Sequence, residues 1–195
     1  MRGDRTIYFV RHGETDWNAA RRLQGQTDIC LNETGRLQAA RNGRMLKELI
    51  RDFAALDFVA SPLSRTRETM EIVRSEIGLE RSAFRTDERL VEINFGHWEG
   101  FTWQELPDRD PEGHQARLAD AFGWRPHGGE SYRDLTERIA PWVASLESDV
   151  VVVSHGGVSR ALRGHLLGLD PCEVPHLEVP QDKVLVLRPG IIEWH

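Results

Sequence analysis

The stretch Thr6-Ile7-Tyr8-Phe9-Val10-Arg11-His12-Gly13-Glu14-Thr15 decides the fold of this chain. Its first five residues are mainly β-branched or aromatic and predict a buried strand over 6–10. Ligands of open α/β sheets bind at the carboxyl ends of the strands. We therefore interpret His12 as an imidazole nucleophile beside the cation of Arg11, with Gly13 leaving space around it.

A second stretch repeats this arrangement near the other end of the chain. Val150-Val151-Val152-Val153-Ser154 is another apolar run, and His155-Gly156-Gly157 follows it. Two strands that both end in His-Gly predict two imidazoles, His12 and His155, that face one bound anion.

Alternating strand and helix signals predict an α/β fold with a mostly parallel central sheet and helices on both faces, a three-layer sandwich. Further strands are predicted at 56–60, 84–90 and 150–153, with a closing hairpin at 184–187 and 191–194 turned by Pro189-Gly190. The predicted helices span 33–50 after an Asn32 cap, 65–77, 130–147 with an interruption near Pro141, and 159–167.

Apolar spacing predicts which side of two helices faces the core. In the first long helix, the predicted inward residues are Leu37, Ala40, Met45 and Leu49. In the next helix, they are Met70, Val73 and Ile77. The segment at about 101–127 differs from the rest because it is rich in proline, glycine and tryptophan. We expect it to be an inserted lid within a single domain that spans 1–195.

The bulk composition limits the partners and the compartment. The net charge of −6 argues against nucleic acid or a membrane surface as a partner, since both favour a basic protein face. No apolar run approaches the ~20 residues of a membrane helix, and the start of the chain lacks a secretion signal. Cys30 and Cys172 alone make no disulfide framework, so we expect a cytoplasmic protein. Only Lys47 and Lys183 among the 25 basic residues are lysines. Arginine binds phosphate with a bidentate fork, although Arg21-Arg22 is interpreted as a solvated helix face.

With its further motifs, the chain resembles the histidine phosphatase superfamily, which includes cofactor-dependent phosphoglycerate mutases and many phosphatases. The shared blocks occur in family order over most of the chain: Arg11-His12-Gly13-Glu14-Thr15 with Trp17-Asn18, Ser61-Pro62-Leu63-x-Arg65 with Thr69, Glu92 before Phe95-Gly96-x-Trp98-Glu99-Gly100, Gly128-Gly129-Glu130-Ser131, and Ser154-His155-Gly156-Gly157. The resemblance is closer to the short phosphatases than to true mutases. It implies a phosphoglycerate mutase-like fold and phosphatase activity without a cofactor or metal.

The resemblance and the chemistry of phosphoryl transfer agree on the central residues. His12 would carry the phosphoryl group, and its second ring nitrogen would donate to a backbone carbonyl. Arg11, Arg65 and His155, with Asn18 as a neutral donor, would meet the charge on the phosphoryl oxygens. Each such donor is worth on the order of 3 kcal/mol in the transition state.

Other site residues follow from the resemblance alone. It assigns proton transfer to Glu92, whereas Glu14 and Glu99 are expected to orient loops or cap a helix. Gln24-Gly25 aligns with a loop that touches the substrate phosphate, although the family often has a small hydroxyl residue in place of Gln24. Thr15 and Gly156 are also predicted to contact phosphate or substrate.

Alternative interpretations remain open at this stage. Cys30 and Arg36 have the Cys-x5-Arg spacing of the cysteine-dependent phosphatases, which we interpret as a coincidence at a helix start. His12, His155 and Glu92 could hold a metal, but Arg11 and Arg65 would oppose a cation. The expected partner is a small phosphorylated metabolite. A phosphoglycerate mutase is the second candidate and a non-catalytic phosphate-binding module the third. The oligomeric state is undetermined, with a homodimer among the options.

Overall fold

The computed structural model describes residues 5–195 and contains one six-stranded sheet with the order β3-β2-β4-β1-β5-β6. The strands are β1 (Ile7–Arg11), β2 (Asp57–Ala60), β3 (Arg85–Thr86), β4 (Val150–Ser154), β5 (Val184–Arg188) and β6 (Ile191–Trp194). Strands β1, β4, β2 and β3 are parallel, and β5 pairs antiparallel with β1 and β6. The mostly parallel α/β sheet is therefore confirmed.

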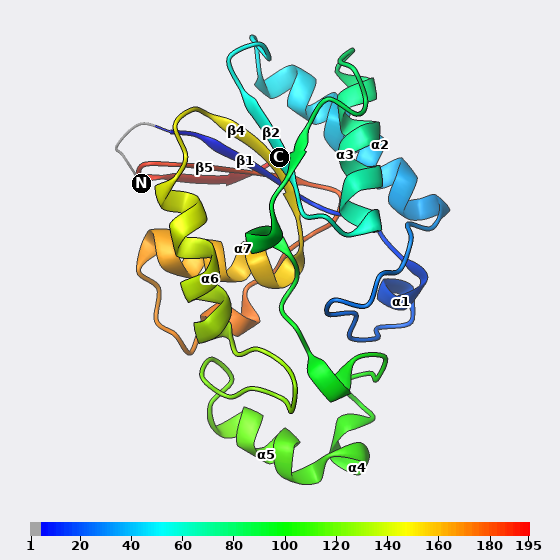
Figure 1. The fold of residues 1–195 in the computed structure, drawn as a ribbon, viewed down its shortest axis with the longest axis vertical. Coiled ribbons are helices and arrows are strands. Elements are labelled where there is room, and N and C mark those ends of the chain that lie inside the picture. The colour runs from blue at the N-terminus through cyan, green and yellow to red at the C-terminus, as the bar shows by residue number, and fades with distance from the viewer. Residues whose placement is uncertain (1–4) are drawn as a thin grey trace.

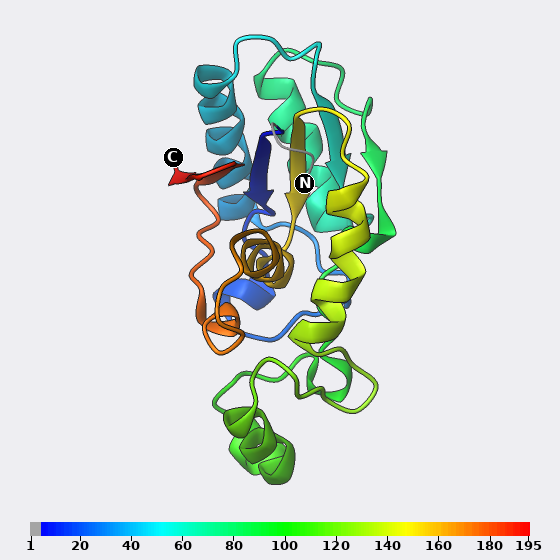
Figure 2. The same ribbon diagram turned by 90° about the vertical axis from the view of Figure 1, so that its left-hand side faces the viewer.

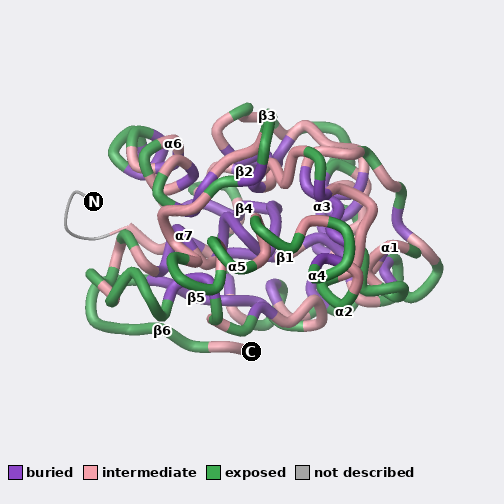
Figure 3. The backbone as a smooth tube through the Cα atoms, turned by 90° about the horizontal axis from the view of Figure 1, so that it is seen from below, coloured by how far each residue is buried: buried purple, intermediate pink, exposed green. Residues whose placement is uncertain are grey.

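Helices cover both faces of the sheet, as predicted (Figure 1). On one face α6 (Tyr132–Ala144) and α7 (Gly156–Leu167) pack on a core that includes Phe9 and Val152. On the other face α2 (Glu33–Leu49) and α3 (Ser64–Glu76) pack on a core that includes Val10, Val151 and Val153. Figure 3 shows that buried backbone is concentrated on the central strands between these layers. Successive residues of β4 thus pack into the cores on opposite faces of the sheet, which explains its uninterrupted apolar sequence.

The register of β1 and β4 places the two His-Gly sequences together. Arg11 is the Cα partner of Ser154, and the backbone N–H of His12 donates to the carbonyl of Ser154 at 2.9 Å. Strand β1 thus ends one residue later than predicted, at Arg11. The adjacent strand β2 ends beside them, since the N–H of Ser61 donates to the carbonyl of Val153 at 3.0 Å.

The 101–127 segment lies at one end of the molecule, toward which the arrows of β1 and β4 point (Figures 1 and 2). It contains α4 (Leu106–Arg109) and α5 (Pro111–Ala119). Leu106 packs in a small separate cluster with Trp98 and Leu23, joined by Trp124. The Asp110 carboxylate accepts a hydrogen bond from the Trp98 indole at 2.8 Å and is hydrogen-bonded to Nε2 of His97 at 2.9 Å. This segment is therefore attached to the body by the 95–100 turn.

The predicted inward face of α2 is only partly correct: Met45 and Leu49 pack, partly buried, against the core, whereas Leu37 does not. Asn32 caps the helix as expected, because its side chain accepts from the N–H of Gly35 at 2.9 Å. However, Leu37 is 67% exposed, while Ala39 and Leu46 are completely buried. The buried face also contains glycine: a Cβ on Gly43 would lie 2.7 Å from Cβ of Glu76 in α3. Close packing of α2 against α3 therefore requires small residues at the contact, and the spacing of large apolar residues does not reveal them. The inward residues predicted for α3 are confirmed.

The third predicted strand is much shorter than 84–90. Only Arg85–Thr86 pair with β2, after which the Asp87 side chain accepts from the N–H of Arg89 and starts a 3₁₀ turn over Glu88–Leu90. The guanidinium of Arg138 in α6 donates to the carbonyls of Arg89, Val91 and Glu92. These bonds hold the chain away from the sheet edge.

Two helix predictions also need correction. Helix α6 continues through Pro141 to Ala144, because the proline removes one bond close to the helix end and Trp142 and Val143 remain buried in the core. Helix α7 begins at Gly156, three residues earlier than predicted, since the carbonyl of His155 already accepts from the N–H of Ser159. The closing hairpin is confirmed, with Gly190 in the turn at φ 74°.

In the described residues, no helix combines the length and apolarity that crossing a membrane requires.

The corrected face of α2 can be tested by truncating two leucines of the same helix. We expect Leu46→Ala to lower the free energy of unfolding by about 2–5 kcal/mol, because it leaves a cavity in the core. Leu37→Ala should cost less than about 0.5 kcal/mol, because the side chain is already solvated. Urea unfolding at neutral pH measures both changes, and equal losses would contradict the assignment.

Candidate active site

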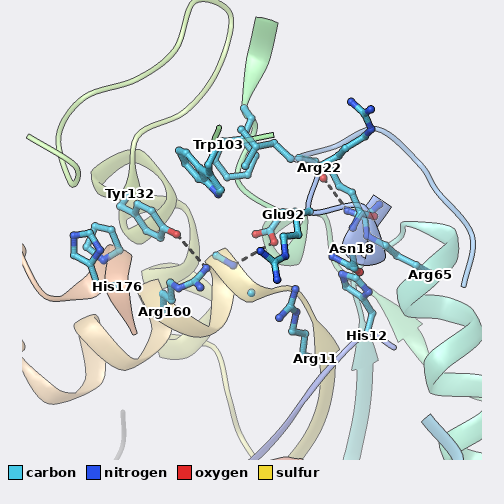
Figure 4. Close-up of a pocket in the computed structure, with 18 of the residues that line it drawn as sticks. Arg11, His12, Asn18, Arg22, Arg65, Glu92, Trp103, Tyr132, Arg160 and His176 are labelled. Atoms are coloured by element: carbon cyan, nitrogen blue, oxygen red, sulfur yellow. Dashed lines mark hydrogen bonds between the residues drawn. The ribbon is translucent and has the colours of Figure 1, made fainter. Parts of the chain in front are cut away.

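A cavity of about 530 Å³ opens at the carboxyl ends of β1 and β4 (Figure 4). Most of the predicted site residues line it: Arg11, His12, Asn18, Gln24, Gly25, Arg65, Glu92 and Gly156. His155 and Thr15 are not among the lining residues: His155 is completely buried, and Thr15 is the N-cap of α1 (Asp16–Ala19). The structure therefore brings together residues from five separate parts of the sequence.

The two histidines lie side by side. Their ring centroids are 5.1 Å apart, with the ring planes at 64°. Nδ1 of His12 is 2.7 Å from the carbonyl oxygen of Gly13, so this nitrogen carries the proton and donates it. The expected backbone partner is therefore present, and Nε2 of His12 holds the free lone pair. Nε2 of His155 is hydrogen-bonded to the Ser61 hydroxyl at 2.8 Å.

Both imidazoles are neutral in this environment. Burial, followed by the charges of Arg65 and Arg11, lowers the pKa of His12 well below its ordinary value. Burial and the neighbouring Arg65, His12 and Arg11 lower the pKa of His155 in the same direction. A neutral imidazole keeps the lone pair that nucleophilic attack requires.

Arg11 and Arg65 bring two buried cations to the histidines. The Arg11 guanidinium donates to the carbonyl of Val179 at 2.7 Å, and Arg65 donates to the carbonyls of Gly25 and Thr27 at 2.7 and 2.8 Å. Burial lowers the pKa of Arg11 to about 10 and also lowers the pKa of Arg65. Both groups remain charged at neutral pH, and the carbonyls fix their orientation.

Several buried polar atoms of these residues lack a hydrogen-bond partner. Among the described residues, eight buried side-chain nitrogen or oxygen atoms have none. Four of the eight belong to the predicted site: Nε of Arg11, Oε1 of Gln24, Nε of Arg65 and Nδ1 of His155. Unpaired buried polar groups are costly, so their concentration here indicates a site built for a polar ligand.

Thr15 holds the side chain of Asn18 in place. Thr15 caps α1, accepting from the N–H of Asn18, and its own N–H donates to Oδ1 of Asn18 at 3.2 Å. Gln181 donates to the same oxygen at 3.2 Å. With Oδ1 occupied, the amide NH₂ of Asn18 is the group available to a ligand. Thr15 itself does not line the cavity, unlike the predicted contact, because the helix cap uses its hydroxyl.

The 24–27 loop is held from below by Glu99. This carboxylate accepts from the backbone N–H groups of Gln26 and Thr27 at 2.9 and 3.1 Å. Gly25 has φ 51°, and a Cβ there would overlap Oε1 of Glu99. Glu99 therefore orients a loop, as predicted, and Glu14 does the same by accepting from Asn32 at 3.0 Å. Gln24 reaches the cavity although it is only 7% exposed.

Among the described residues that line this cavity, Glu92 is the one carboxylate. Its two oxygens accept from the backbone N–H groups of Ile93 and Gly157, at 2.9 and 3.2 Å. A Cβ on Gly157 would overlap Oε1 of Glu92 and lie 2.9 Å from Cγ2 of Ile93. The second glycine of the His-Gly-Gly sequence therefore makes room for this carboxylate.

Sequence reasoning missed several cations of the cavity. Arg21, Arg22, Arg117 and Arg160 also line it, beside Tyr132. The interpretation of Arg21-Arg22 as a solvated helix face is therefore incomplete, since both side chains are exposed but border the cavity. A signal existed for Arg160: it lies five residues after His155, within the first turns of α7.

The Cys-x5-Arg spacing and the possible metal ligands are the two alternative motifs. Cys30 is exposed, outside the lining, and precedes the Asn32 cap of α2, so the Cys-x5-Arg spacing is a helix start. In the described part of the chain, no three His, Cys, Asp or Glu side chains are grouped as a metal ion would require.

Comparison with known proteins supports the motif assignment. Residues 7–194 match the histidine phosphatase superfamily (branch 1). Glucosyl-3-phosphoglycerate phosphatase from Mycobacterium tuberculosis is 35% identical over 186 residues, which cover 89% of this chain and 80% of that protein.

Two solved structures extend the similarity to the fold. A mycobacterial glucosyl-3-phosphoglycerate phosphatase in complex with VO₃ superposes with a TM-score of 0.80 at 34% identity, covering 98% of this chain and 96% of that one. The alpha-ribazole phosphatase of Shigella flexneri gives a TM-score of 0.79 at 26% identity, covering 93% and 89%.

The buried neutral histidines predict a pH dependence of stability. In the unfolded chain, histidine takes up a proton near pH 6.5, whereas the lowered pKa values keep His12 and His155 neutral in the folded protein. Below about pH 6.5 the unfolded state thus binds more protons. The free energy of unfolding should fall by about 1.4 kcal/mol per pH unit for each histidine.

Urea unfolding between pH 7.5 and 5.5 measures this slope above the range where Asp and Glu titrate. His12→Gln and His155→Gln should each reduce this slope by about 1.4 kcal/mol per pH unit, which corresponds to one proton. Leu37→Ala, which changes no titratable group, should leave it unaltered. One common slope for all four proteins would contradict the assignment.

Proposed function

The chain belongs to the histidine phosphatase superfamily and is a phosphatase of that type; we propose that it is a metal-independent phosphomonoester hydrolase that acts on a small phosphorylated metabolite through a phosphohistidine intermediate. One observation carries this proposal. The lone pair on Nε2 of His12 is free because Nδ1 donates to the carbonyl of Gly13. The neighbouring Arg11, Arg65 and His155 each have a buried side-chain nitrogen without a hydrogen-bond partner.

In the first step, Nε2 of His12 attacks phosphorus and the bond to the leaving oxygen breaks. Arg11 and Arg65 bind the equatorial oxygens, where negative charge is spread. In this mechanism His155 carries its proton on Nδ1, which serves as a third donor, while Nε2 accepts from the Ser61 hydroxyl 2.8 Å away. The amide of Asn18 and the loop of Gln24 and Gly25 complete the contacts to the phosphoryl group, with Gly156 at its edge.

Glu92 handles the protons of both steps. In its acid form it gives a proton to the departing alkoxide, which leaves as an alcohol. It then takes a proton from a water molecule that attacks phosphorus, and the bond to Nε2 of His12 breaks. The products are the alcohol, inorganic phosphate and the free histidine. Two guanidinium groups supply the positive charge that a metal ion supplies in other phosphatases.

The 101–127 segment serves as a lid within one domain. Trp103 and Arg117 from this segment line the cavity. Arg22 anchors it to the body through a 3.7 Å ion pair with Glu105, and also donates at 2.6 Å to the carbonyl of Gly100, which directly precedes the segment. Its side chains would therefore select the alcohol portion of the substrate.

Phosphoryl transfer between positions of phosphoglycerate is the second candidate, favoured by one observation. A mutase must hold a doubly phosphorylated intermediate, and the lid brings Arg117 to a cavity that already contains Arg160. Incubation with 3-phosphoglycerate separates the two reactions. Release of inorganic phosphate indicates the hydrolase, whereas formation of 2-phosphoglycerate indicates the mutase.

The phosphohistidine route predicts the behaviour of two variants toward para-nitrophenyl phosphate. His12→Ala should reduce turnover to background, because the nucleophile is absent. Cys30→Ser should retain full turnover, because this thiol lies outside the cavity. A chelator should leave the parent enzyme unaffected. Rapid acid-free quenching should trap an acid-labile phosphoryl label on the parent but not on His12→Ala. A label that survives acid, or loss of activity with chelator, would refute the mechanism.

The packing of Gly157 against Glu92 gives a separate prediction. Gly157→Ala should lower kcat/KM by about 100-fold, because the methyl group displaces the carboxylate that transfers protons. Gly156→Ala is the matched control: its Cβ would lie no closer than 3.5 Å to Arg160 or Arg11 and away from Glu92, so the loss should be smaller. Adding Glu92→Gln to Gly157→Ala should cost little more, since both changes remove the same function. Additive losses would contradict this role.

A further inference from the structure

Gln181 lies outside the lining of the cavity and contacts two residues that the proposed mechanism uses. Its side-chain Nε2 donates to the carbonyl oxygen of His12 at 3.0 Å and to Oδ1 of Asn18 at 3.2 Å. His12 and Asn18 both line the cavity, on the same side of it (Figure 4). One amide group therefore links the backbone of the nucleophile to a side chain that is available to the phosphoryl group.

Backbone groups determine how the two amide side chains are oriented. The N–H of Thr15 can only donate, so the atom of Asn18 that it contacts at 3.2 Å is the oxygen Oδ1. The carbonyl of His12 can only accept, so the group of Gln181 beside it is the NH₂. Exchanging nitrogen and oxygen in either side chain would bring two donors or two acceptors together. Gln181 thus helps to hold Asn18 with its NH₂ group left for a ligand.

The peptide group between His12 and Gly13 is held at both ends. Its carbonyl accepts from Gln181, and its N–H donates to Oγ1 of Thr69 at 3.2 Å. The following carbonyl, that of Gly13, accepts from Nδ1 of His12 at 2.7 Å. Because this carbonyl fixes the protonated nitrogen of the imidazole, rotation of the peptide would disturb the nucleophile. The bond from Gln181 opposes that rotation.

The segment that carries Gln181 is itself fixed by hydrogen bonds. Asn42 of α2, which is completely buried, donates to the backbone carbonyl of Gln181 at 2.9 Å. Three consecutive carbonyls before it each accept from an arginine at 2.7 Å: Leu177 from Arg160, Glu178 from Arg163 and Val179 from Arg11. The backbone therefore presents the Gln181 amide in a fixed place, which lowers the entropic cost of its two bonds.

We propose that Gln181 is a positioning residue for phosphoryl transfer, acting through Asn18 and through the peptide between His12 and Gly13. The proposal rests on the proposed function, because it takes His12 as the nucleophile. Gln181 does not line the cavity, so its effect reaches the substrate only through these two neighbours. A misplacement on the order of 1 Å can lower a rate about 100-fold, and the effect should therefore fall on kcat more than on KM.

An uncharged variant of similar length tests this role. With para-nitrophenyl phosphate, Gln181→Met should lower kcat about tenfold, because the donor is lost, and change KM less than about threefold. Orthovanadate, which adopts the five-coordinate geometry of the transition state, should inhibit this variant about tenfold less strongly. Inhibition by inorganic phosphate should weaken less. Gln115→Met is the matched control: this glutamine is exposed on α5, outside the lining, and its loss should leave all four constants unchanged.

A double-mutant cycle separates positioning from general support of the fold. In the Asn18→Ala background, Gln181→Met should lower kcat by only about threefold or less, because one of its two partners is already absent. A residue that merely supports the fold would lower kcat by the same factor in both backgrounds. Urea midpoints establish that each variant is folded under the assay conditions. Gln181→Glu keeps the side-chain length and replaces the NH₂ by an oxygen, so it repeats the cycle if Gln181→Met does not fold.

The outcomes distinguish failure of this proposal from failure of the proposed function. If the parent turns over para-nitrophenyl phosphate and the folded Gln181 variants match its kcat, the positioning role is refuted and the phosphatase stands. Equal factors with and without Asn18→Ala also refute it. Absence of turnover in the parent refutes the proposed function instead. A loss in kcat that shrinks in the Asn18→Ala background, together with weaker inhibition by orthovanadate, supports the assignment.

Discussion

The parallel pairing of β1 with β4 is the constraint on which the rest of the site depends. Because Arg11 is opposite Ser154, the residues that follow each strand, His12 and His155, leave the sheet at the same edge and at the same level. A shift of one residue would turn one imidazole toward the opposite face of the sheet. Alternate residues of β4 pack into the cores on either side, so the helices of both layers maintain this register.

The electrostatics of the site follow from the burial of two arginine side chains beside two imidazoles. The same arrangement lowers the pKa values of His12 and His155 and brings that of Arg11 to about 10. Backbone carbonyls of Gly25, Thr27 and Val179 offset part of the cost by accepting from the guanidinium groups. The remaining unpaired donors favour an anion. The neutral state of His12 and the preference of the site for an anion thus have one physical origin.

Local sequence patterns predicted the elements but not all of their faces. The strands other than β3, the Asn32 cap and the Pro189-Gly190 turn depend on backbone preferences within a few residues, and the structure confirms them. The inward face of α2 depends on how closely it approaches α3, which requires Gly43 and leaves Leu37 in solvent. The short β3 depends on Arg138, which is distant in sequence and captures three carbonyls of the following segment.

By itself, the sequence determined that His12 and His155 lie together at one edge of the sheet, because two strands that end in His-Gly fix where those side chains must lie. It also determined the α/β class through the alternation of strands and helices. Only the tertiary structure decided that Thr15 supports Asn18 instead of lining the cavity, and that Arg117 and Arg160 both line it. The physical reason is distance along the chain. Contacts between the 101–127 segment, a helix and a loop depend on how separate elements pack, and no local pattern encodes that.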